Sequence, residues 1–196
     1  MQVTTLSFSN MHNHGELFAN VLRARRKTFI ERNKWDLPEA SGMEYDQYDT
    51  PASRWVAVHE FGEVLAGVRL TPTTARCGIY SYMIRDAQLG LLDAIPRDLL
   101  FDTAPVASHI WESSRVFVAD CVPARLRLRV QIALIDEMVR SARTLGATSL
   151  IGIIPEHSPR LARRTGIECV PAGPVIQTGE DERSVCVTIG LQSKMH

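Results

Sequence analysis

The strongest constraint on the fold is a long amphipathic helix between two strand-like segments. Residues 123–146 carry apolar side chains at helical spacing. One row comprises Leu126, Val130, Leu134 and Met138. Segment 110–118 before the helix and segment 149–154 after it both indicate strands, and the second is almost entirely apolar, as in a strand covered on both faces. Strand, helix and strand in this order form a β-α-β crossover, which predicts a layered α/β protein with a mixed sheet.

Length and composition predict a single domain over residues 1–196. The chain is 45% apolar and 22% charged, and it is long enough to bury a core. The formal net charge is zero, which gives no indication of a nucleic-acid partner. The N-terminus lacks the pattern of a signal peptide, and no apolar stretch reaches membrane-spanning length, so we expect no membrane contact.

The cysteines and histidines predict neither disulfides nor a metal site. Cys77, Cys121, Cys169 and Cys186 are far apart and form no C-x-x-C pair, which favours a reducing cytoplasm as the location. No pair of histidines has a ligand-like spacing, so we predict no metal. Neither Cys121 nor any serine has the context of an activated nucleophile, which disfavours a covalent intermediate on a side chain of the protein.

The stretch 43–49 has acidic and aromatic side chains and no apolar period. Its carboxylates are Glu44, Asp46 and Asp49. Such a charge run is most often a solvated loop. The alternative is that it forms the acidic half of a charged site. The candidate basic half is Arg25, Arg69 and Arg115, on three separate predicted elements.

Arg25 lies on the apolar face of a helix predicted over residues 15–32. The other members of that face are Phe18, Val21, Leu22 and Phe29. A lone arginine in this position commonly extends its head group to solvent. If it points inward instead, it needs a carboxylate partner, and the acidic loop is a candidate source.

Segment 110–118 contains two charges, Glu112 and Arg115, three residues apart. In a regular strand they face opposite sides of the sheet. A bulge at Ser113–Ser114 brings both to one face, and bulges are common beside active sites. The simpler alternative is one charge outside and one satisfied inside.

The remaining segments predict shorter elements. Strands are expected at 3–8, 54–60, 64–71, 167–172, 175–178 and 184–191, and short helices at 86–92, 96–100 and 158–165. Segment 179–182 is a turn, and 33–50 is a long irregular connection of the kind that is often functional. Residues 77–105 are either plain core or the wall of an apolar cavity.

Charge is unevenly distributed along the chain. Residues 121–165 hold eight arginines against three acidic residues, a local charge of +5. A basic region on a neutral protein indicates an anionic partner for that face, although arginines that only solvate helix backs are an equal alternative on charge alone.

These motifs together resemble the LuxI-type acyl-homoserine-lactone synthases, the autoinducer synthases of quorum sensing. The matching residues are Arg25-x-x-x-Phe29 with Trp35, Glu44-x-Asp46-x-x-Asp49, Arg69, and Glu112-x-x-Arg115. Their order and spacing fit the family signature over roughly the first 120 residues.

The resemblance implies a fold and a reaction. The fold is a three-layer αβα sandwich similar to GCN5-related N-acetyltransferases (GNAT), with a V-shaped split in a mixed central sheet. The segment around 10–52 is then a mobile lid over S-adenosylmethionine. This molecule is a substrate, and no prosthetic group is implied. Its amine attacks an acyl thioester, and its carboxylate then displaces methylthioadenosine, giving an N-acyl-L-homoserine lactone.

The resemblance also implies residue roles. Arg25, Asp46, Asp49, Arg69 and Arg115 form an electrostatic cluster at the S-adenosylmethionine site, with Arg69 and Arg115 also among the catalytic candidates. Phe29 and Trp35 close over the ligand, although packing of the first helix is the alternative for both. Glu44 and Glu112 are the two candidates for the base that takes the amine proton.

The acyl donor is implied more loosely. The implied acyl pocket is Ser113, Leu150, Gly152 and Ile154. The absence of a threonine in 149–154 disfavours a 3-oxo chain, and Gly152 either leaves room for a longer chain or packs against a neighbour. The thioester carrier is acyl carrier protein or CoA. For an acidic carrier protein, the docking candidates are Arg160, Arg163 and Arg164.

Two other functions remain open from the residues. A GNAT-type N-acyltransferase using acyl-CoA normally has a glycine-rich turn before its long helix, and residues 122–130 contain no glycine. A non-catalytic ligand sensor on the same fold would bind ligand without turnover. We expect an enzyme that is a cytoplasmic monomer.

Overall fold

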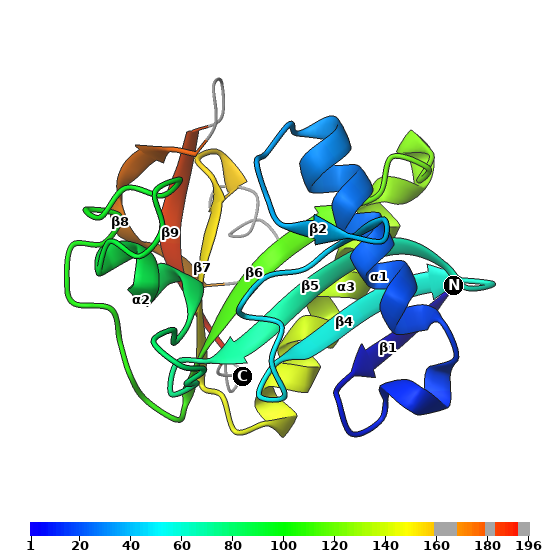
Figure 1. Cartoon of the computed structure of the whole chain (residues 1–196), viewed down its shortest axis with the longest axis horizontal. Coiled ribbons are helices and arrows are strands. Elements are labelled where there is room, and N and C mark those ends of the chain that lie inside the picture. The colour runs from blue at the N-terminus through cyan, green and yellow to red at the C-terminus, as the bar shows by residue number, and fades with distance from the viewer. Residues whose placement is uncertain (159–167, 179–182, 192–196) are drawn as a thin grey trace. The chain divides into compact units, whose positions relative to one another are not determined.

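The computed structural model describes residues 1–158, 168–178 and 183–191, and the chain divides into two compact units. Unit 1 consists of Met1–Leu70 and Arg115–Ser141, and unit 2 of Thr71–Ser114 and Ala142–His196. Strand β6 (Ile110–Val118) contributes residues to both units (Figure 1). The single domain over 1–196 and the mobile lid over 10–52 stay predictions.

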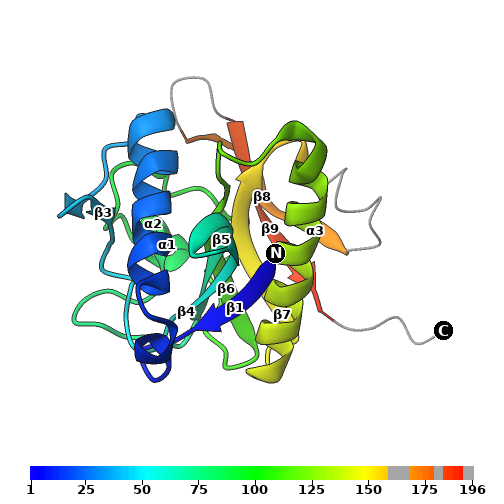
Figure 2. The ribbon, with the colours of Figure 1, turned by 90° about the vertical axis from the view of Figure 1, so that its right-hand side faces the viewer.

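Unit 1 has an antiparallel meander with a helix on each side. Its elements are β1 (Gln2–Leu6), the 3-10 helix η1 (Met11–His14), α1 (Leu17–Arg25), the π-helix η2 (Arg26–Arg32), β2 (Glu39–Ala40), β3 (Met43–Glu44), β4 (Arg54–Glu60), most of β5 (Glu63–Pro72), the end of β6 and most of α3 (Ala124–Thr144). Strand β1 pairs antiparallel with β4, and β4 with β5. Helices α1 and α3 cover opposite faces of these strands (Figure 2).

The β4–β5 hairpin turns at Phe61 and Gly62. Both residues have positive φ, 50° and 84°. This is the conformation of a tight two-residue turn whose twist matches that of the flanking strands, and glycine adopts it without steric cost.

Helix α3 confirms the predicted long amphipathic helix, with bounds two or fewer residues inside the predicted ones. Val130, Leu134 and Met138 are buried against the sheet, whereas Leu126, which we placed in the same row, is 38% exposed in the first turn. On the buried side, Thr5 Oγ1 of β1 donates to Glu137 Oε1 of α3 at 2.8 Å. A satisfied polar contact of this kind fixes the helix against the edge strand.

The predicted helix over 15–32 is two elements. The α-helix ends at Arg25 and continues as a π-helix, in which the amide of Asn33 donates to the carbonyl of Thr28 five residues earlier, at 3.0 Å. The apolar spacing at i and i+4 fits both helix types locally, so it did not reveal the change. π-helical turns are rare and are frequent at functional sites.

Unit 2 combines a parallel and an antiparallel pairing. Its elements are the start of β6, α2 (Met83–Gln88), β7 (Ser149–Pro155), β8 (Cys169–Gln177) and β9 (Arg183–Gly190). Strand β7 pairs parallel with β6 and antiparallel with β9, and β9 pairs antiparallel with β8. The parallel register runs from Ile110↔Ser149 to Ser113↔Gly152.

These strands and flanking helices confirm the predicted α/β class with a mixed sheet. The core of unit 2 lies between α2 and one face of its strands, and its buried members are Tyr82, Ile84, Ala87, Leu99, Ala104, Ile151, Ile176 and Cys186. The V-shaped gap beyond the β6–β7 pairs stays a prediction. Among the described residues, no helix has the length and hydropathy that crossing a membrane requires.

Several short elements differ from the expectations. The helix predicted at 86–92 begins earlier, at Met83, and the segment predicted as a helix at 96–100 is irregular apart from a turn at residues 97–98. Segment 77–105 is instead held by bonds to backbone: Gln88 Nε2 donates to the Asp102 carbonyl at 2.8 Å, and the Tyr82 hydroxyl donates to the Pro105 carbonyl at 2.5 Å. Such side-chain contacts leave no periodic pattern in a sequence.

At the C-terminal end, the two strands predicted at 167–172 and 175–178 are one strand, β8, with an irregular register between Pro171 and Val175. Nearly all of the helix predicted at 158–165, and the whole turn at 179–182, lie outside the described residues. Arg160, Arg163 and Arg164 are therefore also outside them.

Candidate active site

Arg25 points into unit 1 and is 1% exposed. Arg25 shares the inward face of α1 with Leu17, Val21 and Leu22. These three side chains are buried, and Arg25 is buried beside them. A buried guanidinium requires acceptors, and Arg25 has two. Its Nε donates to Glu44 Oε2 at 2.5 Å, and its Nη1 and Nη2 donate to Asp49 Oδ1 and Oδ2 at 2.7 and 2.9 Å.

The acidic loop is folded back on itself, and the side chains of its three carboxylates are nearly inaccessible. The amide of Asp46 donates to Asp49 Oδ2, and the amide of Tyr48 donates to Asp46 Oδ1, each at 2.9 Å. The Asp49 amide donates to the Asp46 carbonyl at 3.0 Å, which closes a turn. Aspartates commonly make local contacts of this kind, and here the turn directs both carboxylates toward the arginines.

Two further arginines reach the same carboxylates from β5 and β6. Arg69 is fully buried; its Nη1 lies 2.5 Å from Asp46 Oδ1 and 3.1 Å from Asp49 Oδ1. Arg115 donates from Nε to Glu44 Oε1 at 3.2 Å and from Nη2 to Asp46 Oδ2 at 2.9 Å. Its backbone is left-handed, with φ of 54°, so β6 departs from a regular strand at this residue, directly after the predicted bulge at Ser113–Ser114.

The six side chains form a closed ring of alternating charge, which we call the ion-pair ring. Its order is Arg25, Glu44, Arg115, Asp46, Arg69 and Asp49, returning to Arg25. Each arginine binds two carboxylates and each carboxylate binds two arginines. The predicted pairing of the acidic loop with the three arginines is therefore confirmed. All six residues belong to unit 1.

The ring keeps its aspartates ionised. Burial by itself raises the pKa of Asp46, but the positive charges of Arg69 and Arg115 outweigh it and hold the pKa below its usual value. The same balance, with Arg69 and Arg25, lowers the pKa of Asp49. For Arg25, burial lowers the pKa, whereas the carboxylates of Asp49 and Glu44 outweigh burial and raise it.

A stacked pair of aromatic side chains lies next to Arg115 of the ion-pair ring. Phe29 stacks on Trp35, with centroids 5.1 Å apart and planes 17° apart, and the Arg115 guanidinium lies 5.6 Å from the centre of the Phe29 ring. Phe29 is 3% exposed, so it also packs in the core, as its alternative interpretation required. Trp35 is only half-buried.

Two further aromatic residues of this site, Tyr48 and Trp55, were not predicted from the sequence as site residues. Trp55 Nε1 donates to Asp49 Oδ1 at 2.9 Å, and the Arg69 guanidinium lies 5.6 Å from the centre of the Tyr48 ring. Both are buried. A tryptophan shortly after an acidic loop, with an indole donor that must be satisfied if buried, was an available indication of this contact.

Glu112 contacts backbone amides in unit 2. Its Oε1 accepts from the amide of Ile84 at 2.8 Å, and its Oε2 lies 3.4 Å from the amide of Met83, at the start of α2. Burial is the main cause that raises the pKa of the Cys186 thiol, to about 12, and the negative charge of Glu112 is the second cause. These contacts give Glu112 a role in anchoring segment 77–105, beside any part in chemistry.

The predicted acyl-pocket residues belong to unit 2. Leu150, Gly152 and Ile154 alternate along β7, on the face opposite Ile151 and Ile153, which pack toward the core of unit 2. Gly152 is paired with Ser113, and a Cβ at Gly152 would lie 2.6 Å from Ser113 Oγ and 2.9 Å from the Ser113 carbonyl oxygen. This favours close packing over extra room as the reason for the glycine.

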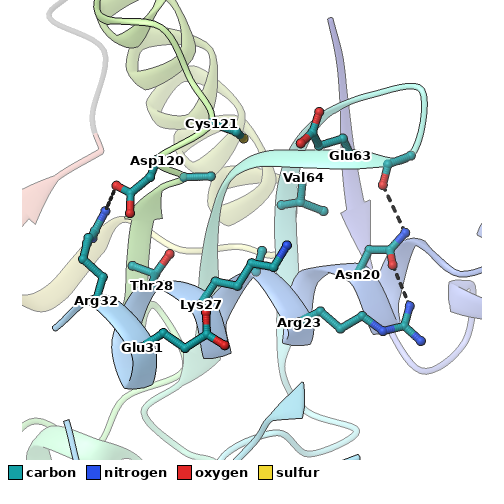
Figure 3. A pocket seen from close by; sticks show the side chains of 13 residues that line it. Asn20, Arg23, Lys27, Thr28, Glu31, Arg32, Glu63, Val64, Asp120 and Cys121 are labelled. Carbon is teal, nitrogen blue, oxygen red and sulfur yellow. Dashed lines mark hydrogen bonds and ion pairs between the residues drawn. The ribbon is translucent and has the colours of Figure 1, made fainter. Parts of the chain in front are cut away.

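A separate polar groove of about 710 Å³ lies in unit 1 between the α1–η2 helix and the residues that precede α3 (Figure 3). Its charged and polar lining includes Asn20, Arg23, Lys27, Glu31, Arg32, Glu63 and Asp120. Arg32 Nη1 binds Asp120 at 2.6 Å and Asn20 donates to the Gly62 carbonyl at 3.0 Å. The groove includes no member of the ion-pair ring.

The fold places the chain among proteins built like N-acyltransferases. The crystal structure of an acyl-CoA N-acyltransferase from Pseudomonas aeruginosa is similar with a TM-score of 0.61, over 96% of this chain and 99% of that chain, at 13% identity. At this identity the likeness shows the fold alone. It agrees with the predicted GNAT-like architecture.

The family follows from the sequence as a whole. The family model for autoinducer synthases matches residues 8–192. An acyl-homoserine-lactone synthase of Ralstonia nicotianae is 31% identical over 186 residues, covering 85% of this chain and 83% of the relative. The crystal structure of TofI in a ternary complex with an inhibitor and MTA is 26% identical, with a TM-score of 0.76 over 98% of this chain and 92% of that chain. This chain belongs to the autoinducer synthase family.

Proposed function

We propose that this protein is an acyltransferase that makes an N-acyl-L-homoserine lactone, a quorum-sensing signal. In the first step the amine of S-adenosylmethionine attacks an acyl thioester, an amide bond forms and the thiol leaves. In the second step the methionyl carboxylate attacks its own γ-carbon, and methylthioadenosine leaves as the ring closes. The ion-pair ring, in a chain of the autoinducer synthase family, is the observation that carries this proposal.

The chemistry of the ring suits this substrate. S-adenosylmethionine brings an ammonium, a carboxylate and a sulfonium, so its site needs acids, guanidinium groups and aromatic faces at different ends. In our proposal Arg25, Arg69 and Arg115 are held by the three carboxylates in one geometry, and Phe29 and Trp35 lie over the sulfonium end. S-adenosylmethionine is a substrate, and TofI, the 26% identical relative, was solved with MTA.

The proton of the attacking amine needs an acceptor. Both Glu44 and Glu112 are fully buried and already hydrogen-bonded: each oxygen of Glu44 accepts from an arginine, and Glu112 accepts from backbone amides. Both oxygens of Glu44 are thus engaged by guanidinium groups, which suits a residue that holds the arginines in place. We propose that Glu44 positions the arginines and that proton removal depends on Glu112. Glu44→Gln and Glu112→Gln test this in acylation assays, and equal loss in both variants contradicts the division of roles.

The donor is proposed to be acyl carrier protein or acyl-CoA. Besides Arg160, Arg163 and Arg164, the outward face of α3 offers Arg125, Leu128, Arg129 and Ile132, with Leu128 61% and Ile132 46% exposed. Arginines beside exposed apolar side chains suit an acidic carrier that binds briefly at each turnover. Reversing the charge of Arg125 and Arg129 should raise the KM for acyl carrier protein while leaving the KM for acyl-CoA unchanged. No change in either KM would place carrier docking elsewhere.

The acyl pocket is proposed at Ser113, Leu150, Gly152 and Ile154, with a 3-oxo chain disfavoured. The one experiment that tests the function is mass spectrometry of the products that the purified protein makes from S-adenosylmethionine and a panel of carrier and CoA thioesters. We expect methylthioadenosine and lactone in equal amounts. Acylated acceptor without methylthioadenosine would indicate an ordinary N-acyltransferase, and ligand binding without turnover would indicate a sensor.

Oligomeric state and location are also part of the proposal. We propose a monomer that acts in the cytoplasm. Sedimentation velocity at several protein concentrations tests the first statement, and fractionation of expressing cells tests the second.

A further inference from the structure

Gly67 of β5 lies against the edge of the Phe117 ring of β6. A Cβ built at Gly67 would be 2.8 Å from Phe117 Cε1 and 3.0 Å from its Cζ, and 3.4 Å from the carbonyl oxygen of Val56. Gly67 has an ordinary strand backbone without positive φ, so conformational freedom does not explain the glycine. The space that its missing side chain leaves is filled by Phe117.

Phe117 in turn contacts the aromatic pair beside the ion-pair ring. It is 4% exposed, and its ring lies 6.0 Å from that of Phe29, edge to face at 82°. Phe29 stacks on Trp35 and faces the Arg115 guanidinium. The contacts therefore run without a break from Gly67 through Phe117 and Phe29 to Trp35 and Arg115, all in unit 1.

We infer that Gly67 and Phe117 are positioning residues for binding S-adenosylmethionine, because together they set where the Phe29 ring stands over the site. The inference rests on the proposed function, in which Phe29 and Trp35 close over that substrate. A close-packed core does not absorb a small displacement locally, so an added methyl at Gly67 moves the Phe117 ring and its neighbours with it.

The test compares Gly67→Ala, Phe117→Leu and the double variant. In Gly67→Ala we expect the KM for S-adenosylmethionine to rise about tenfold, because the new methyl displaces the Phe117 ring and Phe29 with it, with kcat and the KM for the acyl thioester within about twofold. Leucine lacks the ring edge that collides with the new methyl. The double variant should therefore have a KM no higher than that of Phe117→Leu alone, which is a non-additive result.

Leu134→Ala is the matched control. Leu134 is 3% exposed and belongs to α3, which covers the face of the unit 1 strands opposite α1 (Figure 2). Loss of side-chain volume there should lower the melting temperature by a similar amount to Phe117→Leu without changing the KM for S-adenosylmethionine. A merely structural role of Phe117 predicts that the two variants behave alike.

Two outcomes overturn the inference. One is a wild-type KM in Gly67→Ala, and the other is a double variant whose KM is the product of the two single effects. If Gly67→Ala does not fold, the comparison of Phe117→Leu with Leu134→Ala still decides, because Phe117→Leu creates space and does not overpack. Failure of the proposed function gives a different result, because the wild-type protein itself would then release no methylthioadenosine.

Discussion

Arg25 and Asp49 form a two-point ion pair in which both side chains are nearly inaccessible, 1% and 7% exposed. The pair closes the ion-pair ring, since Arg25 also binds Glu44 and Asp49 also binds Arg69. Buried ion pairs are weak sources of stability, because desolvation cancels much of the attraction. The arrangement is therefore explained better by a site that needs charges held in fixed positions than by stabilisation of the fold.

Removing Asp49 should be strongly destabilising. In Asp49→Ala, Arg25 and Arg69 each lose one carboxylate and the Trp55 indole loses its acceptor. Uncompensated buried charge costs about 3–5 kcal/mol, and we expect the free energy of unfolding in urea to fall by that order. The control is Glu16→Ala, which removes the partner of Arg23 from an exposed pair, with an expected change below about 1 kcal/mol. Similar losses in the two variants would contradict a closed, buried ring.

The ring should also make stability depend on acid pH. The pKa values of Asp46 and Asp49 are lowered in the folded protein, first of all by Arg69 acting against burial. Groups with a lowered folded pKa contribute stability that is complete above the unfolded pKa, about 3.9, and is lost as the pH falls through the folded pKa. The free energy of unfolding should therefore decline steeply below about pH 4.

The matching measurement is urea unfolding of wild type and Asp49→Asn between about pH 6 and about pH 3. The variant starts from a lower stability but lacks one of the two shifted carboxyl groups, so its decline with acid should be shallower. Parallel declines would mean that Asp49 titrates in the folded protein as it does in the unfolded chain.

Arg26, at the protein surface, also binds the β2–β3 hairpin that contains Glu44. Arg26 binds both Glu31 and Glu39, and Glu39 is the register partner of Glu44 on the β2–β3 hairpin. Arg25 and Arg26 thus bind the two strands of this hairpin from adjacent positions. In Arg26→Glu we expect the KM for S-adenosylmethionine to rise several-fold, with little change in melting temperature because exposed pairs contribute little stability.

The charge-swapped variant Arg26→Glu/Glu39→Arg is the control for this contact. It should recover most of the lost affinity, and the effect of the single variant should shrink at high salt, since exposed charges are screened. Failure of the swap to recover any affinity would show that Arg26 acts through something other than Glu39.

Gly152 should not tolerate a side chain. In Gly152→Ala the new methyl meets both the hydroxyl and the backbone carbonyl of Ser113, and the carbonyl has no freedom to move away. We expect a loss of about 1–3 kcal/mol in unfolding free energy, as for an overpacked core. Ser113→Ala in the same chain should recover only part of it. Gly190→Ala is the control, because the atoms nearest its added Cβ belong to the side chain of Glu168, which can move. An unchanged stability of Gly152→Ala would contradict the close approach of β6 and β7 at this position.

The sequence by itself determined the elements with strong periodicity and the charged residues of the ion-pair ring. The row Val130, Leu134 and Met138 predicted α3, and the apolar run from Ser149 predicted β7, because burial of one face or of both faces leaves a periodic or continuous apolar pattern. The charged motifs identified all six members of the ion-pair ring, since charges on otherwise apolar elements need partners.

Only the tertiary structure decided which charge binds which. Whether Glu44 accepts from Arg25 and Arg115, or whether Trp55 donates to Asp49, depends on the packing of elements that are distant in the chain. The same holds for the π-helix at Arg26–Arg32, the single helix within 77–105 and the contact of Gly67 with Phe117. Local spacing records the period of an element, whereas the partners of a side chain are set by the fold as a whole, and no pattern within one segment contains them.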